Sequence, residues 1–120
     1  MVVLVCGSRD YTDYSKVYQY LKSLDVSLVI AGGCRGADAL AVRAAKACGY
    51  PFREFPADWQ KFGKAAGPIR NQRMLDEGRP DLVVAFHENP ENSKGTKDMV
   101  DRAKKAGILV QLSRHTLLRM

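Results

Sequence analysis

Long hydrophobic runs, a signal peptide and paired cysteines are all missing from this chain of 120 residues. No apolar run approaches the roughly 20 residues that a membrane-spanning helix needs. The first seven residues, MVVLVCG, lack the basic segment that opens a signal peptide. These absences argue against a membrane protein and a secreted one, so we expect a cytoplasmic protein that has no membrane partner.

Cysteine is scarce, and its spacing fits neither a disulfide framework nor a zinc site. Cys6, Cys34 and Cys48 form no CxxC pair and leave one thiol over. No other set of side chains has the spacing of metal ligands, so we predict no metal site. The sequence indicates no cofactor with certainty, and Mg²⁺ is expected only as the companion of a phosphorylated ligand.

Acidic residues are fewer than basic ones, with 13 Asp and Glu against 19 Lys and Arg. The resulting net charge of +6 favours anionic partners such as phosphates and nucleic acids.

Hydrophobic residues make up 46% of the chain, which argues against disorder. A chain of this length builds about one core. We therefore expect a single domain over residues 1–112, followed by a C-terminal tail over 113–120.

Apolar runs of strand length alternate with helical patterns along the chain. The runs cover residues 2–6, 28–31, 52–55, 82–86 and 108–112. Most are continuous, as is typical of buried parallel strands. Helical spacing of apolar residues predicts helices over about 14–24, 37–48 and 99–106, and a fourth over about 68–77 that ends at Gly78. This order predicts an α/β fold, a three-layer Rossmann-like sandwich whose five-stranded, mostly parallel sheet carries helices on both faces.

Polar and glycine-rich loops follow three of these strands, at 7–10, 32–38 and 87–96, and the carboxyl ends of parallel strands are where such sheets bind ligands. The second loop opens a helix, whose free amides and dipole favour phosphate. Its glycines could equally serve a tight turn alone. The loop matches neither GxxxxGK[ST] nor GxGxxG, which argues against a P-loop NTPase and a dinucleotide dehydrogenase.

Several side chains near these loops suit phosphate, sugar and base. Arg9, Arg35 and Lys94 would neutralise phosphate, whereas Asp38 and Asn71 would select sugar or base. The stretch Ser93 to Thr96 is either a second anion site or a helix N-cap. Trp59 either stacks on a base or covers the core. The alanine-rich helix over 37–48 could pack against the sheet or against a second copy in a homo-oligomer.

Taken in order, five segments of the chain carry a family resemblance. They are GSR at 7–9, GGCRGADALA at 32–41, ADW at 57–59, GKAAGPIRNQRM at 63–74 and SKGTKDM at 93–99. Over residues 2 to about 112 the chain resembles the YspA-type, cpYpsA-related family of the SLOG superfamily. Relatives in that superfamily include the phosphoribohydrolases that activate cytokinins and DNA-processing protein A.

The resemblance implies a Rossmann-like module that binds a nucleotide or a nucleotide-derived small molecule. Together with the residues above, the expected ligand-binding set is Gly7, Ser8, Arg9, Gly32, Gly33, Arg35, Gly36, Asp38, Trp59, Arg70, Asn71, Ser93, Lys94, Gly95 and Thr96. Such a module would act as a sensor, a carrier or a sequestering protein.

Two alternatives stay open. The first is a hydrolase that cleaves an N-glycosidic or phosphate bond, with Asp38, Asp58 or Asp98 as general acid or base. The phosphoribohydrolase signature PGGxGTxxE ends on a glutamate where this chain has Met99, which argues against the same machinery. The second alternative is binding of single-stranded nucleic acid, as in DNA-processing protein A, for which the positive charge is suited.

Overall fold

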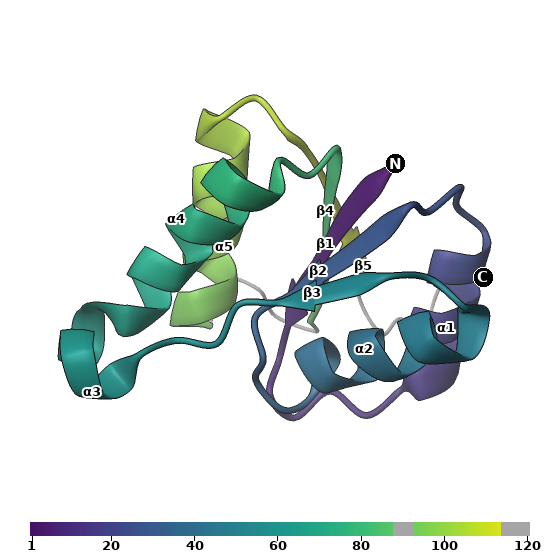
Figure 1. The fold of residues 1–120 in the computed structure, drawn as a ribbon, viewed down its shortest axis with the longest axis horizontal. Coiled ribbons are helices and arrows are strands. Elements are labelled where there is room, and N and C mark those ends of the chain that lie inside the picture. Colours follow the sequence, from purple (N-terminus) through teal and green to yellow (C-terminus); the bar gives the residue numbers. More distant parts are fainter. Residues whose placement is uncertain (88–92, 114–120) are drawn as a thin grey trace.

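A computed structural model describes residues 1–87 and 93–113 as strands and helices that alternate around one sheet (Figure 1). The strands are β1 (Val2–Gly7), β2 (Leu28–Ala31), β3 (Phe52–Glu54), β4 (Leu82–Phe86) and β5 (Leu109–Ser113). The helices are α1 (Tyr14–Lys22), α2 (Ala37–Cys48), α3 (Trp59–Phe62), the 3-10 helix η1 (Gly63–Ala65), α4 (Ala66–Gly78) and α5 (Lys94–Lys105). The sheet order is β3-β2-β1-β4-β5, and every strand pair is parallel. The predicted α/β fold is confirmed.

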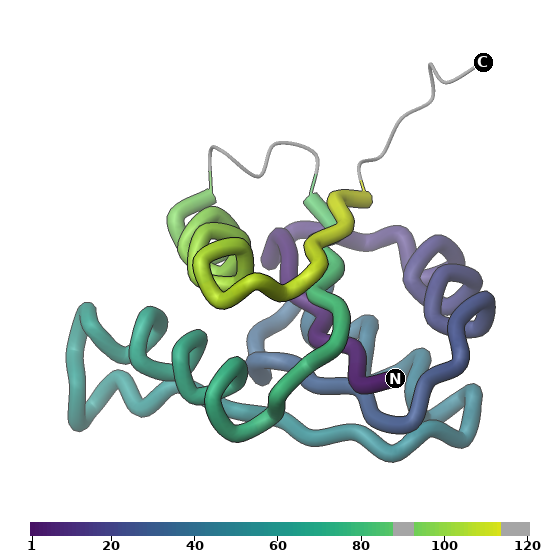
Figure 2. The backbone as a smooth tube through the Cα atoms, turned by 90° about the horizontal axis from the view of Figure 1, so that it is seen from above, coloured from purple at the N-terminus to yellow at the C-terminus, as the bar shows by residue number. Residues whose placement is uncertain are grey.

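Helices cover both faces of the sheet, as Figure 2 shows, with α1 and α2 on one side and α4 and α5 on the other. Central strand β1 is buried on both faces because its neighbours are apolar side chains from both helix layers. Val3 and Val5 face the first pair of helices, and Leu4 and Cys6 face the second. Successive residues of a strand point to opposite faces, so one continuous apolar run supplies both cores.

The alanine-rich face of α2 packs against the sheet. Ala41, Ala44 and Ala45 are fully buried in the core that this helix shares with α1 and β1. Small side chains let the helix lie close to the strands. Of the two partners expected for this face, the sheet is the one found, and a homo-oligomer stays a prediction.

The segment before α4 differs from the sequence-based expectation. The glycine-containing stretch 63–67 was predicted as a loop, but it forms η1 and the first turn of α4, which begins at Ala66. The predicted stop at Gly78 is also wrong, because Gly78 is the last helical residue and Arg79 is the C-cap, with a φ of 49°. Strand β5 includes Ser113, and the rest of the expected tail, 114–120, lies outside the described residues.

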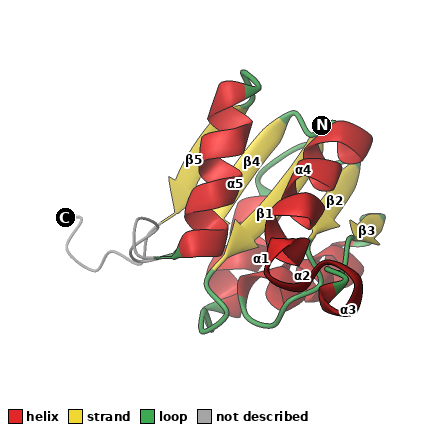
Figure 3. Cartoon of the chain, turned by 90° about the vertical axis from the view of Figure 1, so that its left-hand side faces the viewer, coloured by secondary structure: helices red, strands yellow, loops and turns green. Residues whose placement is uncertain are grey.

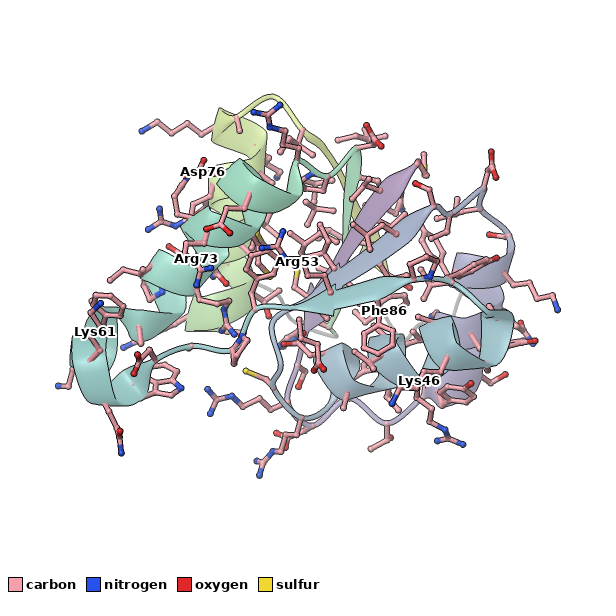
Figure 4. The ribbon with its side chains drawn as sticks, viewed as in Figure 1. Lys46, Arg53, Lys61, Arg73, Asp76 and Phe86 are labelled. Atoms are coloured by element: carbon pink, nitrogen blue, oxygen red, sulfur yellow. The ribbon has the colours of Figure 1, made fainter. Side chains whose placement is uncertain are left out.

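A charged cluster fastens α4 to the edge strand β3. Figure 4 shows Arg53 on β3 and Arg73 on α4 pointing into the same region. Their guanidinium carbons lie 4.3 and 5.5 Å from the ring centre of Phe55. Both arginines also pair with Glu77, over 3.1 and 2.8 Å. Both cations therefore already have an acidic and an aromatic partner within the protein.

The strand order reverses between β1 and β4, because the chain leaves β1 toward β2 and leaves β4 toward β5. Parallel sheets bind ligands beyond the carboxyl ends of the strands at such a point. Here the Ser8 amide donates to the Phe86 carbonyl over 3.1 Å, which joins the two strand ends. In Figure 3, α3 lies at the end of the molecule to which the strands point.

No helix among the described residues is long and apolar enough to cross a membrane.

Candidate functional site

A cavity of about 320 Å³ lies beyond the carboxyl ends of the strands, between the first turns of α4 and α5. The loop after β1, helix α3 and η1 complete its walls. The lining residues are Arg9, Trp59, Lys64, Gly67, Pro68, Arg70, Asn71, Lys94, Gly95 and Asp98. Six of the residues predicted to bind a ligand are thus brought together, along with one of the three candidate acids.

Three of the cations that line the cavity have no partner in the part of the chain that the structure describes. Arg9, Lys64 and Lys94 are exposed, and within residues 1–87 and 93–113 their side chains make no hydrogen bond or ion pair. The carboxylate of Asp98 also lines the cavity, but Arg102 donates to it over 2.8 Å. The cavity therefore has an excess of positive charge, which favours an anionic ligand.

Arg70 lines the same cavity but already has protein partners. Its Nη1 donates to the carbonyl oxygen of Gly32 over 2.5 Å and to that of Phe55 over 3.4 Å. Its Nε donates to Oδ1 of Asn71 over 3.0 Å. The guanidinium thus joins α4 to the loops that follow β2 and β3. This arrangement fixes the cavity wall and commits Nε and Nη1 to the protein, whereas Nη2 has only a long contact of 3.9 Å with Sγ of Cys34.

Asn71 is buried and links the two helices that flank the cavity. Its Nδ2 donates to the Gly95 carbonyl over 3.3 Å and to Oδ2 of Asp98 over 3.0 Å. Because Oδ1 accepts from Arg70, the amide uses both of its ends inside the protein. The structure thus places Asn71 in the wall as a link between α4 and α5.

The glycine that ends β1 and those in the loop after β2 pack closely against other segments of the chain, and none of them lines the cavity. A Cβ on Gly36 would collide with the carbonyl oxygen of Ser8, and one on Gly7 would collide with that of Phe86. The amide of Ala37, at the start of α2, donates to the Ser8 carbonyl over 3.0 Å. A Cβ on Gly32 would lie 2.6 Å from Nη1 of Arg70. The close approach of neighbouring segments of the chain explains why these positions are glycine. Their role in binding a ligand stays a prediction.

Asp38 and Asp58 stand apart from the cavity. Asp38 is buried, and its Oδ2 accepts from the Cys34 amide over 3.2 Å. Burial raises the pKa of Asp38 to about 6, and the Cys34 amide and Arg70 oppose that rise without cancelling it. Asp58 is exposed and caps α3, where its Oδ1 accepts from the Lys61 amide over 3.0 Å. Of the three candidate acids, Asp98 is the one that lines the cavity.

Ser93 and Thr96 bond to each other at the start of α5. The Ser93 hydroxyl accepts from the Thr96 amide over 3.4 Å and donates to Oγ1 of Thr96 over 3.1 Å. The N-cap alternative is therefore confirmed for Ser93. Gly95, between them, has open space where a Cβ would project.

A second, more open hollow of about 350 Å³ adjoins the cavity. Its lining residues are Arg9, Cys34, Arg35 and Trp59, so it contains Arg35 from the predicted set. Arg35 faces Asp10 over 3.6 Å, but the two side chains are 77% and 87% exposed. An exposed pair at this distance holds its members weakly. Arg35 is therefore able to turn toward a bound anion.

Three cavity residues, Lys64, Gly67 and Pro68, are not predicted from the sequence, because its pattern indicates a loop over 63–67 and a helix that begins at about Pro68. The signal that could have found them is Asp58, a strong N-cap residue three positions before Lys61. A helix that begins there brings Lys64 round toward α5. No group of three or more metal-binding side chains occurs in the described part of the chain.

Comparison with known proteins identifies the family and the fold of the chain. A family model described as "YspA, cpYpsA-related SLOG family" matches residues 1–62. The "Gene 61 protein" of Mycobacterium phage D29 is 37% identical over 118 residues, which cover 90% of this chain and 92% of the phage protein. The X-ray structure of DNA processing protein A from Streptococcus pneumoniae has a TM-score of 0.79 at 19% identity, so that likeness extends to the fold. It covers 98% of this chain, which spans about half (51%) of the streptococcal chain. The chain therefore belongs to the YspA, cpYpsA-related SLOG family.

Proposed function

We propose that the protein acts in the cytoplasm and binds a nucleotide or a nucleotide-derived small molecule in the cavity between α3, α4 and α5. Arg9, Lys64 and Lys94 carry the proposal, because these three cations line one cavity and have no protein partner among the described residues. Membership of the SLOG family and the shared fold support a nucleotide- or nucleic-acid-related role in general. The volume of about 320 Å³ falls at the small end of ligand pockets.

The ligand would lie with its phosphate between Lys94 and Arg9, and its base against Trp59. Trp59 is 49% exposed, so its ring offers a surface on which a base could stack. This arrangement requires no acid or base from the protein. A role as sensor, carrier or sequestering protein follows from it.

A hydrolase is the second candidate, and the position of Asp98 on the cavity wall favours it. Against it, Met99 occupies the position of the phosphoribohydrolase glutamate and is 1% exposed within the core under α5. Assays for release of base or phosphate separate the two candidates. If Asp98→Asn abolishes turnover but spares binding, the enzyme hypothesis is correct.

The first test is calorimetric titration with AMP, ADP, NAD and ADP-ribose, each with and without Mg²⁺. Lys94→Ala is the test variant, and Lys104→Ala, an exposed cation near the other end of α5, is the matched control. We expect one ligand to bind, Lys94→Ala to weaken it about tenfold and Lys104→Ala to leave it unchanged. At 100 times its dissociation constant that ligand adds about 2.7 kcal/mol of stability, which thermal unfolding detects. Equal effects of the two substitutions would place the site elsewhere.

A further inference from the structure

The cavity and the second hollow share two walls. Arg9 and Trp59 line both of them, so the depressions adjoin along these side chains. Their volumes are similar, at about 320 and 350 Å³. Each is near the lower limit of about 300 Å³ for small-ligand pockets, which gives each one room for about one nucleotide.

Each depression has its own cations besides the shared arginine. Lys64 and Lys94 belong to the cavity, and Arg35 belongs to the hollow. The side chain of Arg35 is 77% exposed, and its partner Asp10 is 3.6 Å away. Arg9, between the two groups, has no hydrogen bond or ion pair within the described ranges. The positive charge therefore continues from one depression into the other.

We infer that the two depressions form one site for two nucleotides joined through phosphate, with Arg9 at the linking phosphate and Arg35 at the second nucleotide. The inference rests on the proposed function and names the class of ligand for that site. Trp59 lies where the two nucleotides would meet, and its exposed indole would stack on a base. A single nucleotide would engage the cavity and leave Arg35 without a ligand.

The test compares one nucleotide with two by isothermal titration calorimetry. The probes are deoxyadenosine monophosphate, the 5′-phosphorylated 3′,5′-linked dinucleotide of deoxyadenosine, NAD as a 5′,5′-linked dinucleotide, and a ten-nucleotide strand of deoxyadenosine. The variants are Arg35→Ala and, as the control for a lost surface cation, Lys104→Ala. Arg35 is largely exposed, so its replacement leaves the fold intact.

We expect at least one of the two dinucleotides to bind about fivefold or more tightly than the mononucleotide. Arg35→Ala should reduce this advantage and Lys104→Ala should preserve it. The dinucleotide that binds more tightly shows which kind of ligand the site takes, either an oligonucleotide or a 5′,5′-linked dinucleotide.

Three results would overturn the inference, and they are distinguishable. Equal affinity for the mononucleotide and both dinucleotides would limit the site to the cavity and leave the proposed function standing. A ten-nucleotide strand that binds more than about tenfold tighter than the dinucleotide would show contacts beyond the two depressions. Binding of none of the probes would overturn the inference, and it would remove the proposed function as well if AMP, ADP and ADP-ribose also fail to bind.

Discussion

The guanidinium of Arg70 donates a hydrogen bond to the carbonyl oxygen of Gly32 over 2.5 Å, and this contact joins α4 to the loop after β2. The same group also reaches Phe55 and Asn71, so one side chain holds three segments of the chain together. Arg70 therefore stabilises the wall of the cavity. Its predicted contact with a ligand stays a prediction.

Replacing Arg70 should therefore reduce stability. We expect Arg70→Ala to lower the free energy of unfolding by about 2–3 kcal/mol, since charged hydrogen bonds of partly buried groups are lost. Arg70→Lys should recover little, because one ammonium cannot span the same acceptors. Urea denaturation measures both variants. Arg73→Ala is the control on the same helix, and its exposed ion pair should cost less than about 1 kcal/mol.

The glycines at 36 and 95 should respond in opposite ways to alanine. Gly36 has a φ of 74°, and a Cβ there would collide with the backbone of the loop after β1. We expect Gly36→Ala to lower the free energy of unfolding by about 2 kcal/mol or more. Gly95 lies in the first turn of α5 with open space around it, so Gly95→Ala should raise that free energy by up to about 1 kcal/mol. Chemical denaturation of both variants checks the pair, and a loss of stability in both would contradict it.

Asp38 should make stability depend on pH. Its pKa rises from 3.8 to about 6 on folding, so between these values the folded protein holds a proton that the unfolded chain has lost. The stabilising contribution is therefore complete below about pH 4 and is lost as the pH rises through 6. By pH 7 the buried carboxylate costs about 3 kcal/mol relative to acid conditions.

Asp38→Asn tests this dependence, because the amide oxygen can still accept from the Cys34 amide. Denaturation in urea at pH 4, 5, 6 and 7 gives the free energy of unfolding of both proteins. We expect the variant to gain stability relative to the wild type as the pH rises over this range. A difference that stays constant with pH would show that Asp38 titrates normally.

Trp59 and Phe62 provide a matched pair of aromatic residues on α3. Both are partly exposed, at 49% and 39%, but Trp59 lines the cavity and Phe62 does not. We expect Trp59→Ala to weaken nucleotide binding by about 1–3 kcal/mol, whereas Phe62→Ala should leave it unchanged. Since Trp59 is the single tryptophan, ligand binding to the wild type should also alter the intrinsic fluorescence. Equal losses in both variants would indicate a general effect of disturbing α3.

Much of the fold could be predicted because its strands are continuous apolar runs. The ranges of β2, β4 and α2 agree with the sequence pattern residue for residue. The short helices α3 and η1, over residues 59–65, were not predicted. They bury no side chain, so the segment lacks the periodic pattern of apolar residues from which helices are predicted.

The candidate site was only partly predictable, for a different reason. Arg9, Lys94 and Arg70 are all cations in or beside polar, glycine-containing segments of the sequence. Their spacing does not indicate which of them donates hydrogen bonds to acceptors within the protein. Arg70 finds three oxygen acceptors and the sulfur of Cys34, whereas Arg9 and Lys94 find none in the described part of the chain. Similarly, the positive φ of Gly36 can be expected from its place before a helix, but its contact with Ser8 depends on how two distant loops meet.

Because α3 and η1 bury no side chain, the residues that line this side of the cavity are not those that stabilise the fold. Both cores are complete without residues 59–65, yet Trp59 and Lys64 form part of the cavity wall. Mutation can therefore explore new side chains in this segment at little cost to stability. We expect that exchanging this segment for that of a related chain changes which ligand the cavity selects and leaves the framework intact.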